Sequence, residues 1–261
     1  MHERYQNRKL YFDEQAYTTE KYVIPFIANK KLIDKNSRIL EIGCGEGGNL
    51  KPFMDIGCYC MGIDLNDAQI QNAVSFYESH ANKNNLRLQS ADIYTINPSE
   101  YQADIIMLRD VIEHIHNQER FMQFVKQFLQ PDGVIFFAFP PWYMPFGGHQ
   151  QVCKGKISKV PYFHIFPTNI NKKILEMNKV DEKGINDLLE IKETGITIER
   201  FERIAKRENF QILLKEYYFI NPNYEIKFNL KPRKSLPLFR SIPYIRNFYI
   251  TSGYYLLKLN E

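Results

Sequence analysis

A glycine-rich turn after a short apolar segment is the part of this sequence best suited to chemistry. Residues 38–42 are mostly branched and apolar, as in a buried strand, and they lead directly into Gly43 and Gly45. Glycine allows a positive φ angle, and without a Cβ atom its backbone can lie against a ligand. Asp64 follows about 20 residues later, at the end of a second apolar run, where a βαβ unit uses a carboxylate to bind ribose hydroxyls. The spacing therefore predicts a site for a nucleoside-containing cofactor.

The charge beside the glycines distinguishes between two such cofactors. Gly43, Gly45 and Gly48 also satisfy the G-x-G-x-x-G pattern of NAD-binding proteins, which alone is a weak signal. Glu41, however, lies just before the first glycine, where its carboxylate would repel a pyrophosphate. The same carboxylate would attract a cofactor that carries an ammonium group and a sulfonium. An NAD-dependent oxidoreductase is therefore the weaker alternative.

Further motifs follow this turn in an order that is typical of one enzyme family. Ala91-Asp92 precedes a predicted strand at 103–108, Asp110-Val111-Ile112-Glu113-His114-Ile115 follows that strand, and a proline–glycine turn at 129–133 precedes the next strand. Over residues 35–140 this order resembles the class I S-adenosylmethionine-dependent methyltransferases. The resemblance implies S-adenosyl-L-methionine as the cofactor and a Rossmann-like fold.

The resemblance also assigns roles to the residues of these motifs. It places Glu41 near the methionine ammonium group, Asp64 on the ribose hydroxyls and Asp92 on the adenine amino group. The full set expected to bind the cofactor is Glu41, Gly43, Cys44, Gly45, Asp64, Leu65, Asp92, Ile93 and Arg109. Three alternatives come from the residues themselves. Asp64 could cap the helix that follows, although Asn66 already offers that cap, Asp92 could be a plain turn aspartate, and Arg109 could line the substrate pocket instead.

A histidine on a later loop is the candidate catalytic residue. His149 follows Gly147-Gly148 on a loop that leaves the fifth strand at the edge where substrates bind. An imidazole titrates near neutrality, so His149 could contact the acceptor or take its proton. His114 and His164 are expected to have structural roles. If His149 proves remote from the cofactor, Arg109, Asp110 and His114 are the alternatives, or else catalysis by positioning alone.

Segments of strand and helix pattern alternate along the chain, which predicts a parallel sheet covered on both faces. We expect a single α/β domain with a Rossmann-like, seven-stranded, mostly parallel sheet. The resemblance implies that the last strand, from about residue 247, lies antiparallel between the fifth and sixth. The expected parts are an N-terminal cap helix in 1–36, a cofactor-binding core in 37–139, an inserted lid in 140–195 and the C-terminal part of the sheet in 196–261. Within them we expect a helix at 13–33 kinked at Pro25, a helix from about 47, and a helical pattern at 170–192 broken at Gly184.

Composition and charge restrict the class of protein. The 261 residues are 44% hydrophobic and 25% charged, as in a soluble globular protein, and the net charge of +4 favours no particular partner. We find no signal peptide and no apolar run of about 20 residues, so we expect a cytoplasmic protein. The four cysteines form no C-x-x-C pair, so neither a disulfide framework nor a metal site is expected.

The most specific functional prediction is methyl transfer to an oxygen atom of a small molecule. A sugar, a glycan or a lipid-linked intermediate would suit the long lid, whereas an RNA or protein methyltransferase and a non-catalytic cofactor-binding module are alternatives. The segment 227–258 carries seven lysines and arginines and no acid until its end. We interpret it as a basic loop before a buried strand. Nucleic-acid binding is therefore unexpected, and peripheral contact with a membrane is possible but not favoured.

Overall fold

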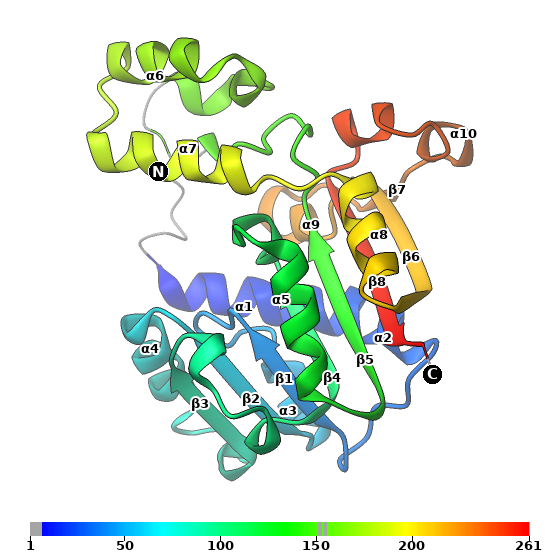
Figure 1. Cartoon of the computed structure of the whole chain (residues 1–261). Coiled ribbons are helices and arrows are strands. Elements are labelled where there is room, and N and C mark those ends of the chain that lie inside the picture. Colours follow the sequence, from blue (N-terminus) through cyan, green and yellow to red (C-terminus); the bar gives the residue numbers. More distant parts are fainter. Residues whose placement is uncertain (1–6, 151–152, 154–155, 261) are drawn as a thin grey trace.

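The central sheet follows from the alternation of strands and helices. In this computed structural model, which describes residues 7–150, 153 and 156–260, eight strands lie in the order β3-β2-β1-β4-β5-β8-β6-β7 (Figure 1). The strands are β1 (Arg38–Ile42), β2 (Tyr59–Asp64), β3 (Leu86–Ser90), β4 (Ala103–Arg109), β5 (Leu129–Phe139), β6 (Phe210–Ile220), β7 (Arg233–Lys234) and β8 (Ser252–Leu259). The predicted α/β class is confirmed. The two-residue edge strand β7 is the addition to the seven strands expected.

The strands pair in parallel from β3 to β5 and antiparallel from β5 to β7 along the sheet. Strands β1 to β5 pair in parallel, so their carboxyl ends and the loops that follow meet at one edge of the sheet. Strand β8 then pairs antiparallel with both β5 and β6, which confirms the predicted position of the last strand. Its centre is buried, since Tyr254, Tyr255, Leu256 and Leu257 are at most 1% exposed.

Helices cover both faces of the sheet because neighbouring strand residues point to opposite sides. In β1, Ile39 belongs to the core beneath α3 (Lys51–Ile56) and the N-terminal helices, whereas Leu40 belongs to the core beneath α5 (Gln118–Val125) and α8 (Ile198–Arg207). The remaining helix beside the first three strands is α4 (Asp67–Tyr77). Figure 1 shows α5 and α8 together on one face, with α1 and α2 on the other. No helix in the described part of the chain is both long and apolar enough to cross a membrane.

The N-terminal helical region differs from the predicted helix at 13–33. Helix α1 (Arg8–Thr18) begins earlier, where the Asn7 side chain accepts a hydrogen bond from the Leu10 amide at 3.0 Å, and α2 (Ile24–Ala28) ends earlier. A π-helical stretch, Thr19–Val23, joins the two helices just before Pro25. Proline has no amide hydrogen, and the wider turn accommodates the interrupted hydrogen-bond ladder. The kink itself stays a prediction. Residues 1–6 of the predicted cap lie outside the described residues.

Residues 140–195 carry two helices above the carboxyl edge of the sheet (Figure 1). Helices α6 (Thr168–Met177) and α7 (Glu182–Thr194) enclose a small core of their own, made of Cys153, Ile157, Phe163, Leu175, Ile185 and Leu188. The prediction of a break at Gly184 was wrong. The break comes earlier, and Gly184 lies in the first turn of α7, where its amide donates a 2.9 Å hydrogen bond to the Asp181 cap. The role of this region as a lid remains a prediction.

Candidate active site

One cavity of about 400 Å³ opens at the carboxyl edge of the parallel strands. Its walls come from the glycine turn after β1, the ends of β2 and β4, the loop after β5, and helices α1 and α9 (Asn223–Phe228). Of the residues predicted to bind the cofactor, the ones that line it are Gly43, Gly45, Asp64 and Arg109, and His149 lines it as well. The fold thus brings the nucleoside-binding pattern and the candidate catalytic histidine into one space.

The glycine turn brings its backbone to the cavity wall. Gly43 and Gly45 have φ angles of 73° and 53°, in the region that favours glycine. A Cβ atom on Gly43 would lie 2.6 Å from Val111 Cγ2, so a side chain there would collide with the loop after β4. Gly48 has a different reason to be glycine, because a Cβ there would lie 2.4 Å from the carbonyl oxygen of Phe12 in α1. These turns also delay the next helix, which begins at Lys51 rather than at the predicted residue 47.

Asp64 ties the end of β2 to the glycine turn. Its Oδ2 accepts a 2.8 Å hydrogen bond from the Gly45 amide, and its Oδ1 accepts one of the same length from the Asn66 amide. Asn66 itself caps α4, because its side-chain oxygen accepts a hydrogen bond from the Gln69 amide. The alternative of Asp64 as the helix cap was therefore wrong. A carboxylate has about four acceptor positions, so these two bonds leave capacity for a ligand in the cavity.

A buried polar network stands behind the cavity and joins three elements. Glu41 is fully buried, and its Oε1 accepts a 2.6 Å hydrogen bond from the Asn49 side chain. Its other carboxylate oxygen has no hydrogen-bond partner among the described residues. Burial raises the pKa of Glu41 to about 8, and the Asn49 amide and the Arg109 guanidinium oppose this effect only in part. A cation that reached this carboxylate would favour its ionised form.

Arg109 extends the network to the N-terminal and C-terminal parts of the chain. Its Nη1 donates to Asn49 Oδ1 at 2.6 Å and to Thr19 Oγ1 at 3.3 Å, and its Nη2 donates to Asn223 Oδ1. The side chain is only 7% exposed, and that surface lines the cavity. Arg109 therefore fixes α9 and the N-terminal helical region against β4, whichever ligand it contacts.

Other residues predicted to bind the cofactor do not line the cavity. Asp92 accepts a 3.0 Å hydrogen bond from the Tyr94 amide and caps a short 3₁₀ turn, as its alternative as a turn aspartate anticipates. The side chains of Ile93 and Cys44 are in the core, whereas Leu65 is 75% exposed. Their part in cofactor binding stays a prediction, and for Cys44 it would have to use the backbone.

Two histidines and two acids line the part of the cavity wall that the loops after β4 and β5 form. Asp110, Glu113 and His114 come from the loop after β4, and His149 comes from the loop after β5. The rings of His114 and His149 meet edge to face, with their centroids 5.1 Å apart. Burial, and to a lesser degree the nearby His114 and His164, lowers the pKa of His149 to about 3. The ring is therefore neutral at physiological pH and is a weaker base than an ordinary imidazole.

The two glycines before His149 have a packing role. A Cβ atom on Gly148 would lie 2.1 Å from His164 Cβ, so this loop and the 162–166 turn touch backbone to side chain. His164 is 4% exposed, and its Nε2 lies 2.7 Å from the Trp142 carbonyl oxygen, which confirms its structural role. The Trp142 ring packs against the His164 ring, and a Cβ atom added to Gly195 would lie 2.6 Å from Trp142 Cδ2. Trp142 thus belongs to the packing of the lid region.

Comparison with known proteins identifies the domain. A family model described as a methyltransferase domain matches residues 12–151. This chain belongs to that family. The predictions of a class I methyltransferase domain and of S-adenosylmethionine as its cofactor are confirmed.

Similar proteins cover different shares of this methyltransferase domain. An uncharacterized protein of Rickettsia prowazekii is 28% identical over 163 residues, which are 60% of this chain and 61% of that protein. A ubiquinone biosynthesis O-methyltransferase of Rhodopseudomonas palustris is 32% identical over 103 residues, or 39% of each chain. The chain thus spans less than two thirds of these relatives. The crystal structure of magnesium protoporphyrin IX methyltransferase from Synechocystis, with bound S-adenosylhomocysteine, is also similar, with 13% sequence identity and a TM-score of 0.56. The superposed region comprises 95% of this chain and 84% of that one. That likeness is one of fold.

Parts of the cavity of this methyltransferase domain have no signal in the sequence. Helix α9 contributes Asn223, Tyr224 and Lys227, and α1 contributes Arg8 and Tyr11. Neither segment carries a motif, and each reaches the cavity only because long-range pairing brings it there. The sole local hint is the polar start of α9 directly after the long strand β6.

Proposed function

We propose that this chain is an S-adenosylmethionine-dependent O-methyltransferase whose acceptor is a small molecule with a lipophilic part. One observation carries the proposal: a single cavity is lined both by the nucleoside-binding turn and by a group of ionisable side chains. A module that only bound the cofactor would not need the second feature. The names of relatives such as the ubiquinone biosynthesis O-methyltransferase of Rhodopseudomonas palustris support an oxygen acceptor.

The residues of the cavity fit the cofactor on three counts. Gly43 and Gly45 offer backbone without side chains, Asp64 offers spare acceptor capacity for ribose hydroxyls, and Glu41 has an unpartnered carboxylate oxygen behind the wall. S-adenosylmethionine, when bound, supplies a methyl group on a positively charged sulfur. The carboxylate of Asp64, and that of Glu41 in the ionised form that a nearby cation favours, suit such a cofactor and disfavour a pyrophosphate. The chain itself contributes mainly orientation and exclusion of water.

The ionisable group is suited to take a proton from an acceptor hydroxyl. Burial, and to a lesser degree the nearby Asp110, raises the pKa of Glu113 well above its ordinary value, so that its carboxylate, once ionised, holds a proton more strongly than an ordinary one. His149 lines the cavity, and because its ring is neutral it does not repel the positive charge of a bound sulfonium. We assign acceptor contact to His149 and proton uptake to the group as a whole.

An exposed apolar segment next to the cavity supports a lipophilic acceptor. Ile226 and Lys227 line the cavity, and the chain then exposes large apolar side chains as far as Phe248. We call residues 226–248 the basic apolar segment; its exposed apolar members are Ile226, Phe228, Leu230, Leu236, Leu238, Phe239, Ile242, Tyr244, Ile245 and Phe248. The bases Lys231 and Arg233 are also exposed. Apolar groups beside positive charge suit an anionic membrane surface from which a lipid-linked acceptor could enter.

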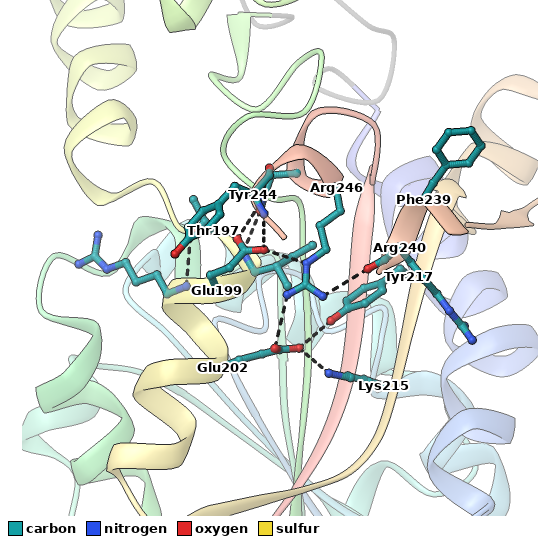
Figure 2. A network of polar contacts seen from close by, with 12 residues as sticks. Thr197, Glu199, Glu202, Lys215, Tyr217, Phe239, Arg240, Tyr244 and Arg246 are labelled. Atoms are coloured by element: carbon teal, nitrogen blue, oxygen red, sulfur yellow. Dashed lines mark hydrogen bonds and ion pairs between the residues drawn. The ribbon is translucent and has the colours of Figure 1, made fainter. Parts of the chain in front are cut away.

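A polar network holds this segment against α8, so that its apolar side chains stay outside (Figure 2). Glu199 accepts hydrogen bonds from the Tyr244 amide and from Arg246 Nε, both at 2.8 Å. Glu202 accepts hydrogen bonds from Tyr217 at 2.6 Å and from Lys215 at 2.8 Å, and it lies 3.5 Å from Arg246 Nη2. Leu238 is thus 72% exposed although its segment is held in place by these contacts.

The proposal is tested by methyl-transfer assays with radiolabelled cofactor on hydroxylated acceptors, with and without lipid tails, in the presence of vesicles. Phosphatidylglycerol vesicles should sediment the protein, and neutral phosphatidylcholine vesicles should not. Leu238→Glu should weaken sedimentation, whereas Leu32→Glu, an equally exposed control on the opposite end of the parallel sheet, should not. Transfer to an RNA or a protein but to none of the small acceptors would contradict the proposed function. Binding to neither kind of vesicle would contradict the membrane contact, and equal binding to both would contradict the preference for an anionic surface.

A further inference from the structure

Three potential metal ligands meet at the cavity wall. Glu113, His114 and His149 each present a ligand atom, and these atoms lie within 4.8 Å of one another. Two of the residues follow β4 and the third follows β5, so neighbouring strands of the sheet bring them together. All three line the cavity that holds the nucleoside-binding turn. Cysteine spacing gave no reason to expect a metal, but histidine and carboxylate ligands need no such motif.

The carboxylate of Glu113 is the least satisfied group of the three. The residue is 3% exposed, and neither of its carboxylate oxygens has a hydrogen-bond partner among the described residues. A buried carboxylate without partners is costly, and it persists in proteins when it is neutralised by a proton, by a cation or by a metal ion. No arginine or lysine forms an ion pair with it in the described part of the chain. Its surface contributes to the cavity, so a cation in the cavity can reach it.

The backbone of His149 is held in an unusual conformation. Its φ angle of 56° lies in the left-handed region, which costs a residue with a side chain of order 1 kcal/mol. The tight contact between Gly148 and His164 keeps the loop there, and its result is an imidazole beside His114.

We propose that Glu113, His114 and His149 bind one divalent transition-metal ion, such as Zn²⁺ or Co²⁺. Two imidazoles and one carboxylate are a donor set that such ions prefer, and three protein ligands leave a position open toward the cavity. Bonds of about 2.1 Å in tetrahedral geometry place ligand atoms roughly 3.4 Å apart. The ligand atoms, which lie within 4.8 Å of one another, therefore need to approach by at most about 1.4 Å when the ion binds.

The open position gives the ion a function that rests on the proposed methyl transfer. An acceptor hydroxyl bound there loses its proton more readily, because the ion stabilises the oxyanion. The O–H bond breaks and its proton passes to Asp110 or to water. The oxygen forms a bond to the methyl carbon, while the sulfonium–carbon bond breaks and its electron pair stays on sulfur. The low basicity of the His149 ring is then no disadvantage, because the ring acts as a ligand.

The site is tested by metal binding, which needs no substrate. The full chain, treated with a chelator and desalted, is titrated with Co²⁺ by absorption spectroscopy and with Zn²⁺ by calorimetry. We expect one ion per chain and a visible tetrahedral Co²⁺ spectrum. Glu113→Gln and His149→Gln should each weaken binding by at least about 100-fold, more than a change outside the ligand shell. His116→Gln is the matched control, because His116 is exposed and pairs with Glu190.

Each outcome decides one part of the inference. Thermal unfolding checks that every variant is folded, and His114→Gln provides a third ligand variant if one of the others is not. Absence of stoichiometric binding, or binding that the ligand variants leave unchanged, overturns the site. Full methyl transfer by the metal-free protein overturns its function in the reaction but not the site. Metal binding without transfer to any acceptor upholds the site and contradicts the proposed function.

Discussion

Replacing Asp64 tests the link between the glycine turn and the cofactor most directly. In the structure its two carboxylate oxygens accept hydrogen bonds from the Gly45 and Asn66 amides, both at 2.8 Å. Asp64→Ala removes these bonds together with the predicted bonds to ribose. Asp64→Asn keeps the shape but has one acceptor oxygen, so its amide nitrogen faces a backbone N–H donor. Both variants should bind the cofactor more weakly, and alanine should have the larger effect.

The expected magnitude follows from the charge of the lost acceptor. Hydrogen bonds to charged groups contribute about 1.5–3 kcal/mol each, and a pair that is partly open to solvent about 2–4 kcal/mol in total. Since each 1.4 kcal/mol is about a tenfold change, Asp64→Ala should weaken S-adenosylhomocysteine binding by about 30-fold to 1,000-fold. The stability of the protein should fall less, because water in the cavity can replace the carboxylate as a partner for the two amides.

The assay is calorimetric titration with S-adenosylhomocysteine, accompanied by thermal unfolding of each variant. Asp67→Asn is the matched control, because Asp67 is an exposed aspartate nearby, in the first turn of α4, and does not line the cavity. Undiminished affinity in Asp64→Ala, or an equal loss in Asp67→Asn, would refute the assignment of the ribose to Asp64. Measurable affinity of the parent protein for NAD would refute the charge argument built on Glu41.

Three further predictions concern the core, the acid behind the cavity and the loop histidine. Ending the chain after Arg246 removes β8 from between β5 and β6, together with four almost inaccessible side chains. Burial of each stabilises the fold by about 1.5–3 kcal/mol, and the sum approaches the whole stability of a domain, so the product should be insoluble or unfolded. A cooperative thermal transition would contradict this. Because the pKa of Glu41 is raised to about 8, its contribution to stability is complete below about pH 4.5 and is lost as the pH rises through about 8. The stability of Glu41→Gln, measured by urea unfolding at a series of pH values, should lack that decline. Parallel stability profiles for the parent and the variant would show that the carboxyl is solvated. The His149 ring, with its pKa lowered to about 3, should show no titration by NMR between about pH 5 and 8, and a titration midpoint near 6.5 would mean that the loop is open. His149→Gln should slow methyl transfer by about 10²–10⁴-fold without changing the affinity for S-adenosylhomocysteine.

The local parts of the fold and of the site could be predicted from the sequence. Residues 38–42 and Asp64 were identified because a buried strand, a turn that needs positive φ and a carboxylate at the next strand end each depend on nearby residues. The last strand was found from its apolar pattern and from the resemblance. Helix ends were less certain: α1 begins earlier than expected and Gly184 lies inside α7, because a cap and a single glycine each change helix stability by only about 1 kcal/mol.

Only the tertiary structure decided what surrounds these residues. Arg109 meets Thr19 and Asn223, each about a hundred positions away in the chain, and no spacing or periodicity records such contacts. The unpartnered state of Glu113 and its approach to His149 likewise result from the pairing of β4 with β5 and from the packing of Gly148 on His164. The low basicity of His149 comes from burial by these distant segments, whereas its residue type alone predicts an ordinary imidazole. Desolvation depends on the whole three-dimensional surroundings of a group, and a linear sequence specifies those surroundings only through the complete fold.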